Sequence, residues 1–354
     1  MFKGLKVIEL AGVLAGPSVG MFFAELGAHV VKIENPKTGG DTTRQWKLAN
    51  EPAEENTSAY FASVNWGKEH VFLDLTVQKD LLELKEMIAD ADIMICNWKA
   101  GDAEKFNLRY DDVKRINQNI IYAQIKGFDD ERVAYDVVLQ AETGWMFMNG
   151  EVHSGPVKIP VAIIDLFAAH QLKEGILIAF LHKLKTGEGS EVMVSLFDAA
   201  VASLANQAGN YLMSKDIPQR TGSLHPNIAP YGEILQFNDG KSIVLAVGTD
   251  RQFAGLCKIL NCVELLEDAK YSTNKNRVIN RKSLFEMICE KAKNFTGEKF
   301  MDLCIENKIP AGFVRNMQEL FELDAAKKLI LEDEAGKRVR TSIFKINNAS
   351  GKLV

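Results

Sequence analysis

Clustered basic residues are missing from this chain of 354 residues, although lysine and arginine together number 42. Aspartate and glutamate number 47, which gives a formal net charge of −5. A surface that binds nucleic acid neutralises phosphates with basic clusters, so we expect no nucleic-acid partner. A pocket for one small phosphorylated ligand needs only a few local cations and is not excluded.

Long apolar runs and metal-binding motifs are missing as well. No stretch reaches 18 uninterrupted apolar residues, and the first twenty residues lack the order of a secretory signal. We therefore expect no membrane span and a cytoplasmic protein. The five cysteines are scattered, as reduced thiols are, and the six histidines show no spacing typical of zinc sites. We expect no metal and no tightly bound cofactor.

Strand and helix patterns alternate in the first half of the chain. Strands are indicated by "KVIEL", "HVVKIE", "EHVFLDL", "DIMICN" and "NIIYAQIKGF", and helical patterns such as residues 79–91 separate most of them. This alternation predicts an α/β fold with a Rossmann-like parallel sheet covered on both faces. The stretch "SEVMVSLFDAAVASLANQAGNYL" predicts one more strand followed by a single long helix.

A polar linker rich in proline and glycine, "SKDIPQRTGSLHPNIAPYG", precedes a second region. A hairpin around Asn238, Asp239 and Gly240 and helices up to about residue 307 are predicted there. We expect a large domain over residues 1–205, a smaller α+β domain over residues 225–307, and a return to the large domain over residues 308–354.

The glycines of the first turn, "AGVLAGPSVG", do not form a dinucleotide-binding motif. That motif needs G-x-G-x-x-G between a strand and a helix, with an acid ending the second strand. Glu34 supplies the acid, but Gly12, Gly16 and Gly20 are four residues apart. The spacing favours a tight turn on a Rossmann-like sheet over an NAD site.

Five cations follow predicted strands or lie in nearby loops, where open α/β sheets bind ligands. They suit a phosphorylated ligand, and a solvated rim is the alternative interpretation. These cations are Arg44, Lys68, Lys99, Lys105 and Lys126.

Asp165 lies in the apolar stretch "IPVAIIDLFAA", at the start of a helix predicted to extend to about residue 184. Aspartate is a common N-cap, although no Glu or Gln follows at the position that would complete a capping box. A carboxylate among apolar residues can also be partly desolvated, be held ionised by the helix N-terminus, and act as a nucleophile. The residues alone leave both roles open.

Taken together and in order, several motifs resemble the family III CoA-transferases. They are "LKVIELAGVLAGPSVGMFFAELGAHVVKIE", "GGDTTR", "GKEHVFLDL", "ADIMICNWKAG", "YDVVLQAETG", "IDLFAAHQLKEGILIAFLHKLKTGEGSEVMVSLFDA", "GSLHPNIAPYG" and "KIPAGFV". The resemblance implies a Rossmann-like large domain joined by two linkers to a small domain. It also implies an interlocked homodimer.

The resemblance further implies that the chain transfers CoA from an acyl-CoA thioester to a carboxylic acid. Asp165 matches the family's nucleophile, which forms a mixed anhydride and then an aspartyl-CoA thioester. CoA is then a substrate rather than a bound cofactor. The positions that match CoA-contacting residues of the family motifs are Arg44, Lys68, Asn97, Lys105 and Tyr135. Asp136 and Gln140 complete the motif around Tyr135, and we expect a structural role for both.

Three departures from the family pattern leave alternatives open. Glu69 places an acid where a cation often supports CoA, and the printed sequence ends at "NNASGKLV", before the family's usual P-x-L-G-E-H stretch. An idle CoA-binding protein is therefore one alternative. Leu14 replaces the glutamine of some oxalate-specific members, which favours a more apolar acyl group. An α-methylacyl-CoA racemase needs a second base, and no histidine accompanies Tyr135 and Asp136 to supply one.

Overall fold

The computed structural model describes residues 1–130, 132–333 and 336–347. These residues form two compact units. Unit 1 contains Met1–Met146, Lys158–Ile217 and the described residues from Ala325 onward, and unit 2 contains Phe147–Val157 and Pro218–Asp324. The domain ranges expected from the sequence stay a prediction, because compactness does not establish which segments fold independently.

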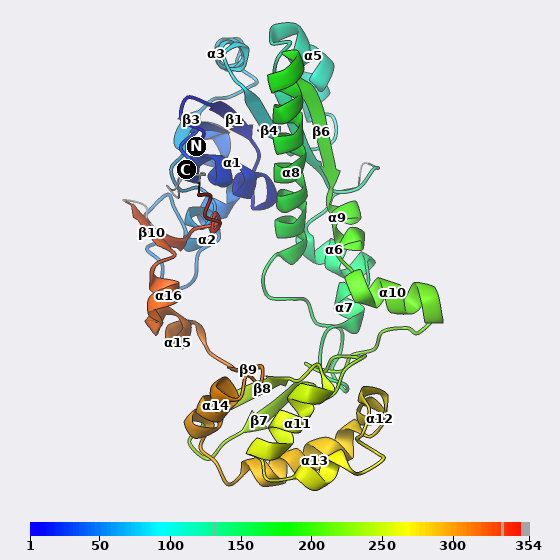
Figure 1. Cartoon of the computed structure of the whole chain (residues 1–354). Helices are drawn as coiled ribbons and strands as arrows, with labels where there is room; N and C mark the ends of the chain where they lie inside the picture. The colour runs from blue at the N-terminus through cyan, green and yellow to red at the C-terminus, as the bar shows by residue number, and fades with distance from the viewer. Residues whose placement is uncertain (131, 334–335, 348–354) are drawn as a thin grey trace. The chain divides into compact units, whose positions relative to one another are not determined.

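Unit 1 is built on a six-stranded parallel sheet (Figure 1). Its strands are β1 Lys6–Leu10, β2 His29–Glu34, β3 Glu69–Phe72, β4 Ile93–Cys96, β5 Ile121–Lys126 and β6 Ser190–Ser195. They lie in the order β3-β2-β1-β4-β5-β6, and every neighbouring pair is parallel. The expected Rossmann-like sheet is confirmed. The direction of strand order reverses between β1 and β4, which is where such sheets bind ligands.

Alternate residues of each strand serve the two faces of the sheet, as the two-residue period of a strand requires. Val7 and Ile93 pack in one apolar cluster with α1 Ala15–Glu25 and α8 Ile163–Thr186. Ile8 and Met94 pack in another cluster with α3 Gln78–Ala89 and α5 Tyr110–Ile116. Helices therefore cover both faces, which explains why β4 is apolar throughout.

The segment after β6 differs from the prediction of one long helix. It forms α9 Leu196–Ala202 and α10 Ala205–Ser214, separated by Ser203 and Leu204. The backbone φ angle of 47° at Ala205 lies in the left-handed region, so a continuous helix cannot pass through this point. The other elements with residues in unit 1 are α2 Ala59–Ala62, α4 Asp102–Phe106, α6 Asp136–Glu142, α7 Trp145–Met148, α16 Asp324–Lys327, and the hairpin of β10 Ile330–Asp333 and β11 Gly336–Val339.

Unit 2 contains a three-stranded antiparallel sheet in the order β7-β8-β9, with β7 Tyr231–Gln236, β8 Ser242–Ala246 and β9 Ala311–Phe313. The expected hairpin around Asp239 is confirmed, because β7 pairs with β8. β9 pairs with β8 and completes this sheet, whereas the expected range 308–354 assigned it to the large domain. The helices are α11 Asp250–Ile259, α12 Asn274–Ile279, α13 Arg281–Ala292, α14 Gly297–Glu306 and α15 Met317–Glu322.

Among the described helices, none combines the length and the apolar character that crossing a bilayer requires. The described residues also contain no group of three or more His, Cys, Asp or Glu side chains placed to hold a metal ion.

Candidate active site

Asp165 lies in the first turn of α8, which begins at Ile163 rather than at Asp165 itself. The interpretation of Asp165 as an N-cap is therefore wrong. The first-turn N–H of Ile164 instead donates to Oδ1 of Asp136, at 2.8 Å. Asp136 lies 28 residues earlier in the chain, so a capping residue brought in by the fold frees Asp165 from that role.

Asp136 is itself held by Gln140, one turn later in α6. Gln140 Nε2 donates to Asp136 Oδ2 at 2.6 Å, and its Oε1 accepts from the Ile159 N–H at 2.7 Å. Both side chains are buried. These contacts agree with the structural role expected for the two residues, since together they tie α6 to the segment that leads into α8.

Asp165 is buried, with only 7% of the residue exposed. Burial first, and the Asp136 carboxylate second, raise the pKa of Asp165 to about 7. A helix N-terminus can hold such a group ionised, but at Asp165 desolvation and the like charge outweigh that effect. Near neutral pH the carboxylate is therefore divided between its two protonation states, and the ionised fraction is poorly solvated.

Tyr60 in α2 stands in the electrostatic field of the same carboxylates. Burial first, then Asp165, Asp136 and Asp41, raise the pKa of Tyr60 to about 12. The phenol therefore stays protonated at neutral pH and is a hydrogen-bond donor in this region. Sequence reasoning missed Tyr60, because nothing in "SAYFA" distinguishes it from a packing aromatic.

A cleft of about 1430 Å³ opens at the carboxyl ends of the parallel strands, within unit 1. Asp165, Asn97 and Tyr135 line it, so the fold brings these three expected site residues together. The lysines among its lining residues are Lys99 and Lys126. The cleft thus combines a desolvated carboxylate with nearby positive charge.

Asn97 and Tyr135 reach the cleft from different elements. Asn97 follows β4, and its side-chain amide makes reciprocal hydrogen bonds with the Gly12 N–H at 3.0 Å and the Gly12 carbonyl at 2.9 Å. Asn97 therefore fixes the turn after β1 across the point where strand order reverses. Tyr135 precedes α6 and is half exposed. Lys105 in α4 is exposed, and its ammonium lies 5.0 Å from the ring centre of Phe106, outside the residues that line the cleft.

Arg44 does not present its guanidinium to the cleft. Its Nε and Nη2 donate to Glu34 at 2.7 and 2.6 Å, and its Nη1 donates to the Asn56 carbonyl at 2.7 Å. The guanidinium also lies over the Phe61 ring, 3.7 Å from its centre. Although burial opposes it, hydrogen bonds from Arg44 and His70 hold the pKa of Glu34 well below its usual range. These contacts give Arg44 a structural role and argue against direct contact with CoA.

Lys68 is also withdrawn from the ligand surface, since its side chain is fully buried. Its ammonium contacts Glu9 Oε2 at 2.8 Å and donates to the Pro17 carbonyl and Asn65 Oδ1, both at 2.9 Å. Burial lowers the pKa of Lys68 to about 8, against the opposing effect of Glu9. Direct contact with CoA would require this cluster to open, so the expected role of Lys68 is not supported.

Glu69, the departure that raised the idle-binder alternative, pairs with His29 at 2.8 Å on the surface. Both side chains are more than half exposed, and Glu69 is not among the residues that line the cleft. Its negative charge therefore gives no reason to expect weak ligand binding.

The sequence and the fold of this chain match those of known CoA-transferases. The model of CoA-transferase family III matches residues 2–345. The chain is 36% identical to succinate–glutarate CoA-transferase of Agrobacterium fabrum (strain C58), over 90% of this chain and 81% of the relative. It is 33% identical to human succinyl-CoA:glutarate CoA-transferase, over 98% and 82%. A crystal structure of a CAIB/BAIF family protein from Brucella suis aligns with a TM-score of 0.83 and 34% identity, over 100% of this chain and 94% of that one.

Proposed function

The chain belongs to CoA-transferase family III, and from this premise we propose that it moves CoA between carboxylic acids through a covalent intermediate on Asp165. The observation that carries the proposal is the buried Asp165 carboxylate in the cleft, with its pKa raised to about 7. A poorly solvated carboxylate with a raised pKa is a better nucleophile than one in water, provided that it is ionised.

The reaction begins when an Asp165 carboxylate oxygen attacks the thioester carbonyl of the acyl-CoA donor. The tetrahedral intermediate expels the CoA thiolate and leaves a mixed anhydride on Asp165. The thiolate then attacks the aspartyl carbonyl, which releases the donor acid and forms an aspartyl-CoA thioester. The acceptor carboxylate attacks this thioester, expels the CoA thiolate and forms a second mixed anhydride on Asp165. The thiolate then attacks the acceptor carbonyl of this anhydride and breaks its bond to the Asp165 carboxylate. Acceptor acyl-CoA leaves and Asp165 is regenerated.

This sequence exchanges one thioester for another, so it needs neither ATP nor a redox partner. Water is the main competitor, because it would hydrolyse the anhydride or the enzyme thioester. Burial of Asp165 limits access of water to both intermediates. CoA is in this scheme a substrate that binds and leaves, and not a tightly bound cofactor.

We infer a dicarboxylic acid as acceptor and a dicarboxylyl-CoA such as succinyl-CoA as donor. Relatives are named for succinate and glutarate, and one from Haloarcula hispanica, 33% identical over 90% of this chain and 81% of the relative, is named succinyl-CoA:mesaconate CoA-transferase. Two features of the cleft suit such substrates. Leu14 offers an apolar wall to the carbon chain, and the exposed Lys99 and Lys126 have no ion-pair partner among the described residues.

We assign Lys99 and Lys126 to the negatively charged groups of the ligands, the CoA phosphates above all. Lys99 follows β4 and Lys126 is the last residue of β5, so both lie at the carboxyl end of a parallel strand, as ligand-binding residues of open α/β sheets do. Lys105 is a third cation for the outer part of CoA, because it is exposed in α4, which follows Lys99 in the chain.

A homodimer is the assembly we propose for this chain. The surface of α8 carries Ile178, Leu181 and Leu184, which are more than half exposed and spaced three residues apart. Soluble monomers rarely expose such a continuous stripe of large apolar side chains to solvent, so this face of α8 is expected to be covered by a second copy. Sedimentation equilibrium tests this assembly: a concentration-independent monomer mass would refute it.

The experiment that tests the function is Asp165→Ala, assayed with succinyl-CoA and a set of dicarboxylic acids. CoA exchange should be abolished, while the fold and the binding of CoA are retained. Asp90→Ala is the matched control, because that carboxylate is 75% exposed and pairs with surface Lys6. Exchange at the wild-type rate in Asp165→Ala would refute the mechanism. A racemase would be favoured if the wild type exchanges the α-proton of its acyl-CoA with deuterated solvent but transfers no CoA to any of the acids.

A further inference from the structure

The turn between β1 and α1 contains a strained residue. Val13 has a backbone φ angle of 69°, in the left-handed region that β-branched residues rarely adopt. Glycine or asparagine would occupy this conformation at lower cost. Val13 lines the cleft that contains Asp165, together with its neighbours Gly12 and Leu14. Strained backbone that persists in a ligand cleft indicates that the surrounding structure enforces it.

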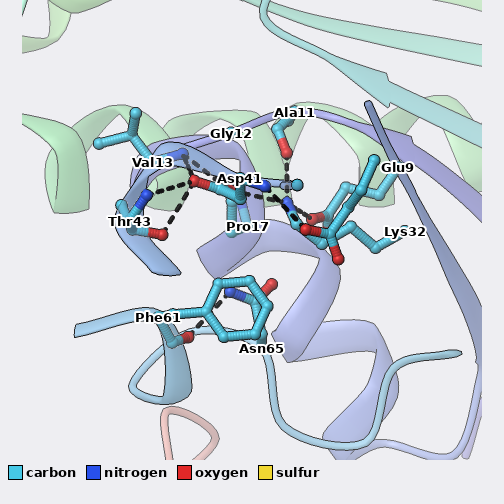
Figure 2. A network of polar contacts seen from close by, with 12 residues as sticks. Glu9, Ala11, Gly12, Val13, Pro17, Lys32, Asp41, Thr43, Phe61 and Asn65 are labelled. Atoms are coloured by element: carbon cyan, nitrogen blue, oxygen red, sulfur yellow. Dashed lines mark hydrogen bonds and ion pairs between the residues drawn. The ribbon is translucent and has the colours of Figure 1, made fainter. Parts of the chain in front are cut away.

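Asp41 makes the contacts that hold this turn. Its Oδ1 and Oδ2 accept from the Val13 N–H at 3.3 and 3.2 Å. Its Oδ1 also accepts from the Thr43 N–H at 3.0 Å and from Thr43 Oγ1 at 2.8 Å. One carboxylate therefore joins the strained turn to the 3₁₀ helix Thr42–Gln45. Figure 2 shows Asp41 between Val13 and Thr43.

Asp41 is fixed in turn by a buried group of charges. Lys32 Nζ lies 3.1 Å from Asp41 Oδ2 and 3.0 Å from Glu9 Oε1, and it donates to the Ala11 carbonyl at 2.5 Å (Figure 2). Lys68 contacts the same Glu9 carboxylate. The side chains of all four charged residues are 2% exposed or less, and their formal charges cancel.

Two of these four buried charges contact the turn that lines the cleft. Lys32 anchors the carbonyl of Ala11, and Asp41 anchors the N–H of Val13, so the cluster holds the turn on both sides of Gly12. Replacing a buried ion pair by apolar residues is often neutral or stabilising, so stability alone does not explain why four buried charges converge on one turn.

The geometry points to Asp41 as a positioning residue for acyl transfer. It keeps Val13 in the left-handed conformation, and thereby holds residues 12–14 as a rigid wall of the cleft in which the thioester meets Asp165. This inference rests on the proposed function, since it assumes that Asp165 reacts in this cleft. Asp41 acts through the turn and takes no part in bond making.

A double-mutant cycle of Asp41→Asn and Val13→Gly tests the inference, with kcat, KM for succinyl-CoA and the melting temperature measured for each protein. Asp41→Asn removes the charge that Lys32 opposes and leaves one acceptor oxygen in place of the two that Val13, Thr43 and Lys32 share, so the strained valine should then relax. Because a misplacement of about 1 Å can cost on the order of a hundredfold, kcat should fall roughly tenfold to a hundredfold, with KM changed much less. The kcat of Val13→Gly alone is the reference for the double variant, because glycine adopts this φ angle without the Asp41 contact.

Rescue is the decisive readout. Glycine needs no clamp to adopt the left-handed conformation, so the double variant should recover most of the kcat that Asp41→Asn loses. A residue that only stabilised the fold would lower the melting temperature without rescue of kcat by Val13→Gly. Asp268→Asn is the control, because Asp268 accepts a similar bond from the N–H two residues later, at 2.8 Å, but lies in unit 2.

A second variant serves if Asp41→Asn does not fold. Thr43→Val removes only the hydroxyl bond to Asp41, and it should give a smaller loss of kcat that Val13→Gly also rescues. The inference is overturned if a folded Asp41→Asn keeps the wild-type kcat, or if the double variant is no faster than Asp41→Asn. An active Asp165→Ala would instead overturn the proposed function, so the two failures are distinguishable.

Discussion

Replacing Asp165 by asparagine should stabilise the folded protein at pH 8 while removing its activity. Folding raises the pKa of this carboxyl from 3.8 to about 7. Each pH unit corresponds to about 1.4 kcal/mol, so the ionised side chain costs the folded state on the order of 4 kcal/mol. Asparagine removes this cost, because it carries no charge to desolvate or to repel Asp136.

The sign of the pH dependence follows from proton binding. Between about pH 4 and pH 7 the folded protein keeps a proton on Asp165 that the unfolded chain has released, so wild-type stability falls as the pH rises through this window. The advantage of Asp165→Asn should therefore be about 4 kcal/mol at pH 8 and less than about 2 kcal/mol at pH 5. A charge in the first turn of α8 interacts favourably with the helix N-terminus, which offsets only about 0.3–1 kcal/mol.

Urea denaturation of wild type and variant at pH 5 and pH 8 measures these differences, at one protein concentration and with freshly purified variant, because slow deamidation restores the acid. Asp90→Asn is the control, and its stability relative to wild type should not change between the two pH values. An advantage of Asp165→Asn that is equal at both pH values, or a less stable variant at pH 8, would refute the reasoning.

Two further predictions concern the charges around the cleft. Asp136→Asn keeps an acceptor for the Ile164 N–H but loses the charge that is the smaller of the two causes raising the Asp165 pKa. The acid limb of kcat/KM should therefore move to lower pH by less than about 1.5 units, and an unmoved limb would contradict the proposed coupling. Lys126→Gln should raise KM for acyl-CoA roughly tenfold with little change in kcat, as expected for loss of a hydrogen bond to a charged group. Steady-state kinetics measures KM for both Lys126→Gln and the control Lys185→Gln, which removes an exposed lysine outside the cleft. Equal KM values for the two variants would show that Lys126 does not hold the ligand.

The sheet of unit 1 was predictable because each strand carries a local signal. β4 is an uninterrupted apolar run, and α3 shows apolar positions three to four residues apart. The turn chemistry of Asn238, Asp239 and Gly240 similarly predicted the hairpin of unit 2. Such patterns depend on neighbouring residues, so they can be recognised without knowledge of the fold.

The environment of the site residues depends on distant partners, and the sequence does not reveal these. Lys68 was expected at the ligand surface, but its partner Glu9 lies 59 residues earlier in the chain. The start of α8 was expected at Asp165, but the cap that allows an earlier start comes from Asp136. Arg44 likewise follows a strand, as ligand-binding cations often do, yet it is bound by Glu34 of that strand.

Trapping the covalent intermediate tests the central claim most directly. The protein is incubated with succinyl-CoA and hydroxylamine, and the peptide that carries Asp165 is examined by mass spectrometry. Hydroxylamine attacks the aspartyl carbonyl of the anhydride or thioester and leaves a hydroxamate on Asp165. We predict this hydroxamate with succinyl-CoA, none with free succinate, and none in Asp165→Ala. An enzyme that exchanges CoA while Asp165 stays unmodified, or a hydroxamate on another residue, would contradict the account.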